Sequence, residues 1–147
     1  MIIFHFFSIL GIPNAGKTSL LFRLYSGIFY SNTQGGIRDF EQARVDQVHL
    51  RTINILEKKL PTEKWEPLTL GSVGHIYVLD VSTQKEYSLG LDFFQRIRVS
   101  RSLQKLPFLI FGNKIDLINP NDEEKLLEDL KLTIEGYNKT YKVQFIS

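Results

Sequence analysis

Residues 11–18 read Gly-Ile-Pro-Asn-Ala-Gly-Lys-Thr, and this stretch is the strongest structural signal in the sequence. It matches the pattern G-x-x-x-x-G-K-[ST] in full, between an apolar run at 2–10 and an amphipathic segment at 17–26. Glycines at this spacing let backbone N–H groups turn inward around a phosphate, and the next helix adds the partial positive charge of its N-terminus. The sequence therefore predicts a phosphate-binding loop, to which we assign Gly11, Asn14, Ala15, Gly16, Lys17, Thr18 and Ser19.

Two side chains of this loop have separate chemical roles. Lys17 is expected to reach the β- and γ-phosphates, and the hydroxyl of Thr18 is expected to ligate Mg²⁺. A glycine-rich turn that binds nothing is the competing interpretation. The strand–loop–helix context of the motif argues against it.

A second motif follows another apolar run, because residues 108–116 read Phe-Leu-Ile-Phe-Gly-Asn-Lys-Ile-Asp and end in N-K-x-D. Guanine presents two donors on one edge, which a single carboxylate accepts together, and adenine lacks that pair. We assign the carboxylate to Asp116. Asn113 is expected to tie this loop to the phosphate loop, and the stem of Lys114 is expected to cover one face of the base. Together the two motifs favour GTP and GDP over ATP.

Strand-like and helix-like segments alternate along the chain. This order predicts an α/β fold of the P-loop NTPase kind, with a doubly wound, mostly parallel sheet that contains one antiparallel strand. The ligand site is then expected at the carboxyl ends of the strands. The expected strands are 2–10, 39–46, 48–56, 75–79, 107–111 and 141–146; the expected helices are 17–26, 84–103 and 120–135; a polar loop is expected at 27–38 and irregular chain at 57–73.

Composition excludes several other classes of protein. The 147 residues are 43% hydrophobic, which suits one domain over 1–147, and the absence of cysteine excludes disulfides, thiolate zinc sites and thiol nucleophiles. Eighteen Lys and Arg against 16 Asp and Glu give a formal charge of +2, which argues against a nucleic-acid partner. The apolar N-terminal run is far shorter than the ~20 residues that span a bilayer. Three histidines, at 5, 49 and 75, lack the spacing of metal ligands and are predicted to be structural.

At this point the chain resembles a small GTPase of the Arf/Sar type. Besides the two motifs, residues 65–80 resemble the Arf stretch in which a Trp precedes a Gly and a strand ending in Asp, and 18–27 resemble the first Arf helix. The tripeptide at 32–34 resembles the β subunit of the signal recognition particle receptor. The resemblance implies a guanine-nucleotide-binding G domain that uses GTP or GDP with Mg²⁺. It also implies a protein partner or regulator, a role in intracellular trafficking and a cytoplasmic location, and leaves peripheral association with the cytosolic face of a membrane open.

The departures from the family pattern concern hydrolysis. The family carries D-x-x-G after its third strand, but residues 55–61 read Ile-Leu-Glu-Lys-Lys-Leu-Pro, and 57–73 contain no Gln to orient water. Glu57 is an alternative outer-sphere carboxylate. Thr33 ligates the metal only if its loop is two residues shorter than usual, because residues 34–35 occupy the ungapped positions. We therefore expect nucleotide binding with weak or absent hydrolysis.

Two other functions compete with a working switch. One is a scaffold that holds GTP without switching and docks a protein partner, as the receptor β subunit resemblance suggests. The other is an ATP-dependent P-loop kinase or ATPase, which N-K-x-D disfavours. The positive charge on residues 84–105 suits either a solvated helix face or a partner surface, and Trp65 either packs on the core or anchors a partner.

The last expectation concerns the C-terminal end of the sequence. In the family the final strand runs into a loop that caps the guanine, and a C-terminal helix then covers the sheet. Ser147 stands at the first position of that loop, so we assign it to the guanine site and expect a C-terminally incomplete domain without the last helix. Two explanations stay open: the chain is a fragment, or a partner covers the apolar flank.

Overall fold

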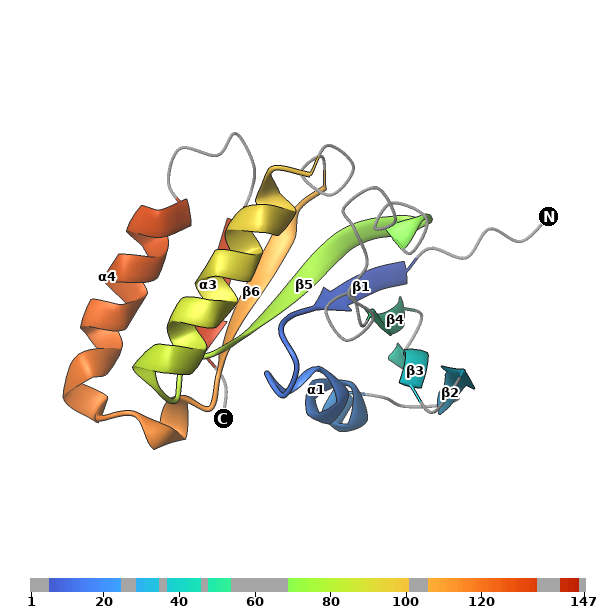
Figure 1. Ribbon diagram of the computed structural model, residues 1–147, viewed down its shortest axis with the longest axis horizontal. Helices are drawn as coiled ribbons and strands as arrows, with labels where there is room; N and C mark the ends of the chain where they lie inside the picture. Colours follow the sequence, from blue (N-terminus) through green and yellow to red (C-terminus); the bar gives the residue numbers. More distant parts are fainter. Residues whose placement is uncertain are drawn as a thin grey trace.

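The chain folds around one seven-stranded β-sheet, whose strand order is β2-β3-β4-β1-β5-β6-β7 (Figure 1). The computed structural model describes residues 6–24, 29–34, 37–45, 48–53, 69–100, 106–134 and 141–145. The strands are β1 (Phe6–Leu10), β2 (Phe29–Gln34), β3 (Ile37–Val45), β4 (Val48–Ile53), β5 (Ser72–Asp80), β6 (Phe108–Asn113) and β7 (Tyr141–Phe145).

Most of the sheet is parallel. β1 pairs in parallel with β4 and β5, and β5–β6 and β6–β7 are parallel pairs as well. β3 runs opposite to the other six strands of this sheet, since it is antiparallel to both β2 and β4. The prediction of a mostly parallel sheet with one antiparallel strand is therefore confirmed.

In the described part of the chain, helices follow three of the strands. Thr83 caps the longest helix, and its side chain accepts a hydrogen bond from the Glu86 N–H at 3.1 Å, as N-cap threonines do. Pro120 begins a single turn directly before the last helix, where a missing N–H costs nothing. The α-helices are α1 (Lys17–Leu24), α3 (Gln84–Arg98) and α4 (Glu123–Ile134), and the 3₁₀ turns are η2 (Ile115–Leu117) and η3 (Pro120–Asp122). No helix among the described residues is long and apolar enough to cross a bilayer.

The helices lie on both faces because the chain builds the sheet on both sides of β1. After β1 it forms β2 at the edge of the sheet and returns through β3 to β4, whereas β5, β6 and β7 follow in order on the other side of β1. Right-handed connections then place α1 on one face and α3 and α4 on the other. Figure 1 shows α3 and α4 side by side, away from α1, which packs against β3 and β4. The point of reversal lies between β1 and β5, where doubly wound sheets bind their ligands.

An aromatic cluster fills the core between β5 and α3. The ring of Tyr77 lies 5.1 Å from that of Phe94, and Phe94 meets Phe108 edge to face at 5.6 Å. The Tyr77 hydroxyl donates to the Gly90 carbonyl at 2.5 Å, so this buried polar atom is satisfied. A Cβ on Gly90 would collide with the Leu79 side chain, so glycine lets α3 approach the sheet closely. His75 packs on Phe108 at 4.9 Å, in agreement with the structural role predicted for it.

Two expected elements differ from the structure. Residues 27–38 were expected as a polar loop, but 29–34 form β2, an edge strand paired antiparallel with β3. Phe29 and Tyr30 favour a strand, but the segment has no apolar alternation beyond them, and pairing with β3 supplies the backbone hydrogen bonds that make the strand. The second helix ends at Arg98 rather than 103, with Val99 as its C-cap. The other elements lie where they were expected to within a few residues, although 1–5 and 54–68 are outside the described part.

Candidate functional site

The phosphate loop joins β1 to α1 at the carboxyl edge of the sheet (Figure 1). Gly16 has a φ of +112°, and a Cβ there would collide with the side-chain amide of Asn113, so no other residue fits. A Cβ on Gly11 would lie 2.7 Å from the Val78 carbonyl oxygen of β5. Both motif glycines are therefore required by close approach of neighbouring chain as well as by the loop itself.

Lys17 lies buried at the first position of α1, with an exposed fraction of 6%. Its Nζ donates to the carbonyl oxygens of Gly11 at 2.9 Å and Ile12 at 3.1 Å. The ammonium therefore lies across the loop, and the first turn of α1 contains no acidic residue that would repel an anion. Thr18 is half-buried and Ser19 exposed in the same turn. This arrangement suits a phosphate group.

Asn113 makes the predicted tie between the two loops. Its side-chain Nδ2 donates to the carbonyl oxygen of Ala15 at 2.9 Å. Its own carbonyl accepts from the Val81 N–H at 3.1 Å, which holds the end of β6 on the end of β5. The two sequence motifs, about 100 residues apart in the chain, are thus in direct contact at one edge of the sheet.

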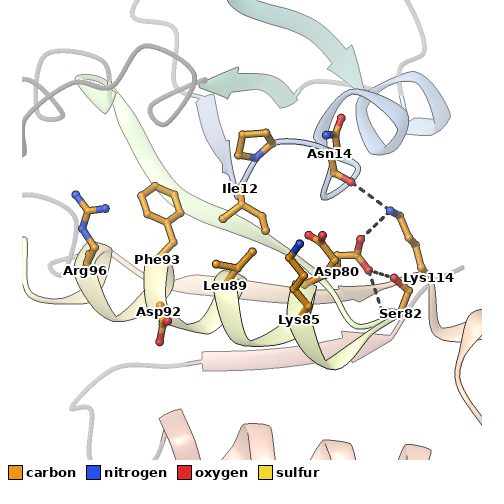
Figure 2. Close-up of a pocket in the computed structure, with 12 residues that line it drawn as sticks. Ile12, Asn14, Asp80, Ser82, Lys85, Leu89, Asp92, Phe93, Arg96 and Lys114 are labelled. Atoms are coloured by element: carbon orange, nitrogen blue, oxygen red, sulfur yellow. Dashed lines mark hydrogen bonds and ion pairs between the residues drawn. The ribbon is translucent and has the colours of Figure 1, made fainter.

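Lys114 and Asp116 follow in a tight turn. Lys114 has a left-handed backbone with φ of +66°, and its carbonyl accepts from the Leu117 N–H at 3.0 Å. Asp116 lies in η2 and is exposed, so its carboxylate is open to a ligand. The Lys114 side chain is 35% exposed and extends toward the phosphate loop (Figure 2). This turn therefore leaves the Asp116 carboxylate exposed and directs Lys114 toward the phosphate loop.

Asp80, which the sequence motifs did not single out as a site residue, lies at the centre of this arrangement. Its Oδ2 accepts from Lys114 Nζ at 2.7 Å, and its Oδ1 accepts from the Ser82 N–H at 2.9 Å. Burial alone would raise the pKa of Asp80, but the hydrogen bonds from Lys114 and Ser82 outweigh burial and hold that pKa below its usual range. Its position at the carboxyl end of a buried strand, beside the point of reversal, was the signal that could have found it.

An open cleft of about 660 Å³ lies between the phosphate loop and α3. Figure 2 shows Leu89 and Phe93 pointing from α3 toward Ile12, with Asp80 and Lys114 at one end of the cleft. Charged side chains of both signs line it. The cleft therefore adjoins the phosphate loop and the base-reading loop, and its lining carries both positive and negative charges.

The metal ligands remain predictions. The described residues hold no group of three or more His, Asp and Glu side chains suited to a metal ion. Mg²⁺ bound with phosphates needs only one or two protein ligands, and the hydroxyl of Thr18 at the start of α1 fits such a site. Thr33 lies in β2 at the register of Arg38, and its side chain is outside the described part. Glu57, Trp65 and Ser147 lie outside the described residues, and so do Arg101 and Lys105 of the basic segment.

The fold and the two loops define a P-loop nucleotide-binding domain of the small GTPase kind. The model of the ADP-ribosylation factor family matches residues 6–147, and the chain belongs to that family. Guanine-nucleotide binding follows from this membership.

Individual relatives agree with the family assignment. ADP-ribosylation factor-like protein 8c of Arabidopsis thaliana is 28% identical over 128 residues, which are 85% of this chain and 68% of that protein. ADP-ribosylation factor 1 of Brassica rapa subsp. pekinensis is 27% identical over 84% of this chain and 68% of its own length. The small COPII coat GTPase SAR1 of Encephalitozoon cuniculi, solved in complex with GDP, has the same fold, with a TM-score of 0.64 and 18% identity over 97% of this chain and 69% of that one.

Proposed function

We propose that this chain binds GTP and GDP with Mg²⁺ where the phosphate loop meets the base-reading loop, and that it hydrolyses GTP slowly or not at all. The hydrogen bond from Asn113 to Ala15 carries the proposal, because it joins the two loops into one site. Family membership supplies guanine-nucleotide binding, and the geometry of this chain's own residues supports where the nucleotide binds.

The phosphates are proposed to bind over the N-terminus of α1. Lys17 is already held across the loop by the carbonyls of Gly11 and Ile12, so its charge is in place before a ligand arrives. The proposed phosphate ligands are Gly11, Asn14, Ala15, Gly16, Lys17, Thr18 and Ser19, with Thr18 on Mg²⁺ and Thr33 as the candidate second metal ligand.

The base is proposed to bind beside the turn that follows β6. The exposed carboxylate of Asp116 would accept both donors of guanine, and the stem of Lys114 would lie along one face of the ring. Ser147 is the proposed further contact to the base. This set prefers GTP and GDP to ATP, because adenine offers a carboxylate only one donor on that edge.

Hydrolysis is proposed to be weak because the sequence lacks the groups that position water. Phosphoryl transfer depends on positioning and charge, and 57–73 contain neither Gln nor D-x-x-G. A non-switching scaffold that binds GTP and docks a protein partner is the second candidate, favoured by the same absence. We place either activity in the cytoplasm, with association at the cytosolic face of a membrane and a role in intracellular trafficking as parts of the proposal.

Nucleotide competition tests the proposal directly. Purified protein is loaded with fluorescent GDP, and unlabelled GTP, GDP, ATP and XTP are titrated against it with and without Mg²⁺. GTP and GDP are expected to compete, and ATP is not. Asp116→Asn should shift preference from guanine to xanthine, whereas Asp122→Asn, a change in an exposed carboxylate on η3, should not.

Single-turnover hydrolysis and partner binding complete the test. Turnover as fast as that of ordinary small GTPases would contradict slow hydrolysis. Equal partner binding by the GTP-loaded and GDP-loaded forms would favour the scaffold over the switch. Displacement of labelled GDP by ATP, or intact guanine preference in Asp116→Asn, would show that the base site is wrongly assigned.

A further inference from the structure

Asp80 uses both of its carboxylate oxygens inside the protein. Oδ1 accepts from the Ser82 N–H at 2.9 Å and from the Ser82 hydroxyl at 2.5 Å, and Oδ2 accepts from Lys114 Nζ at 2.7 Å. The side chain is only 4% exposed. With its oxygens engaged and its surface covered, Asp80 is not placed to touch a nucleotide. Any effect it has on binding must therefore pass through the groups that it holds.

Lys114 is the group that reaches the site. Its Nζ also donates to the Asn14 carbonyl oxygen at 3.2 Å, so one ammonium connects the end of β5 with the phosphate loop (Figure 2). In the described part of the chain, the non-glycine residues with positive φ are Asn14 at 65° and Lys114 at 66°. Such backbone costs energy and persists where surrounding contacts hold it. Here the Lys114 ammonium is hydrogen-bonded to the Asn14 carbonyl, so the two strained residues are in contact. Asp80 holds the ammonium in this position.

We propose that Asp80 is a positioning residue for nucleotide binding: it holds the Lys114 ammonium against the carbonyl of Asn14 and so fixes the base-reading loop on the phosphate loop. The ion pair with Asp80 restricts the long Lys114 side chain to one orientation. In that orientation the methylene stem faces the base. Register strengthens the anchor, because Asp80 at the end of β5 lies opposite Asn113 at the end of β6, directly before the base-reading loop begins. This inference rests on the proposed guanine-nucleotide site.

Nucleotide dissociation measures the effect of this anchor. Asp80→Asn keeps the shape of the side chain but removes its charge, and GDP release is expected to accelerate about 10-fold, since a hydrogen bond between charged groups is lost. Preference for GDP over XDP should stay unchanged, because Asp116 reads the base. Ser82→Ala removes one bond to Oδ1 and is expected to give a smaller acceleration, about 2- to 4-fold.

A double-mutant cycle separates positioning from stability. Lys114→Met keeps most of the stem but has no ammonium, so adding Asp80→Asn to it should change GDP release by less than about 2-fold. Asp92→Asn is the matched control: Asp92 is an exposed carboxylate on α3 that lines the same cleft and points away from the Asp80–Lys114 pair (Figure 2), and its loss should leave release unchanged. Thermal unfolding of every variant shows whether each one folds.

The outcomes distinguish this proposal from the nucleotide site itself. If wild-type protein binds GDP but Asp80→Asn releases it at the wild-type rate, the positioning role is wrong and the site stands. A full effect of Asp80→Asn in the Lys114→Met background also overturns it, because the effect would then not pass through Lys114. If Asp80→Asn does not fold, Ser82→Ala without any acceleration rejects the role instead. Failure of the wild-type protein to bind GDP overturns both proposals.

Discussion

The contact between Asn113 and Ala15 offers the sharpest test of how the site is built. Asn113→Asp leaves the shape of the side chain almost unchanged but replaces the donating amide with an oxygen. An acceptor would then face the Ala15 carbonyl oxygen, which lies 2.9 Å from Nδ2 in the wild-type structure. Loss of the bond costs about 1 kcal/mol, and an unsatisfied or repelled partner adds about 1–2 kcal/mol. The total of about 2–3 kcal/mol corresponds to a roughly 30- to 150-fold loss of affinity.

Isothermal titration with GDP measures this loss. Asn113→Ala is the companion variant, and it should lose less, because alanine removes the donor without placing a second oxygen against Ala15. Asn121→Asp is the matched control, since it makes the same chemical change at an exposed residue of η3. Equal affinities for wild-type protein and Asn113→Asp would refute the idea that this hydrogen bond joins the two loops into one site. Equal losses of GDP affinity in Asn113→Ala and Asn113→Asp would show that repulsion between the carboxylate and the Ala15 carbonyl oxygen adds nothing to the loss of the hydrogen bond.

Three further predictions follow from the geometry. Gly16→Ala should abolish measurable GDP binding, because a Cβ collides with Asn113 at a φ of +112°, and titration calorimetry checks this. Tyr77→Phe should lower the free energy of unfolding in urea by about 1–2 kcal/mol through loss of the hydroxyl bond to Gly90, with GDP affinity unchanged. The depressed pKa of Asp80 makes its contribution to stability complete above the ordinary carboxyl value of about 4, and this contribution is lost as the pH falls through the lower folded value. Urea unfolding of wild-type protein and Asp80→Asn should therefore differ at about pH 6, and the difference should shrink as the pH falls further below about 4; a constant difference would contradict the assignment.

The fold followed from sequence because its strongest signals are local. The apolar run before residue 11, the motif glycines and the lysine at 17 specify a strand, a turn and a helix start through backbone chemistry that needs no distant contact. Alternation of strands and helices then allowed few topologies, because parallel connections are right-handed. The strand at 29–34 was missed for the opposite reason, since only its first two residues are aromatic, the rest show no alternation, and the strand forms by pairing with β3.

The same division holds within the site. The sequence by itself assigned the proposed roles, Lys17 to phosphate, Asp116 to the base and Asn113 to the tie, because each belongs to a short motif whose spacing is dictated by the ligand. Tertiary structure alone decided that Asp80 holds Lys114 and that Lys114 meets Asn14. Those partners lie 34 and 100 residues apart, and only the pairing of β5 with β6 beside β1 brings them within hydrogen-bonding distance. The sequence shows that Asp80 ends a strand-like run, but only the folded sheet shows which cation lies beside its carboxylate.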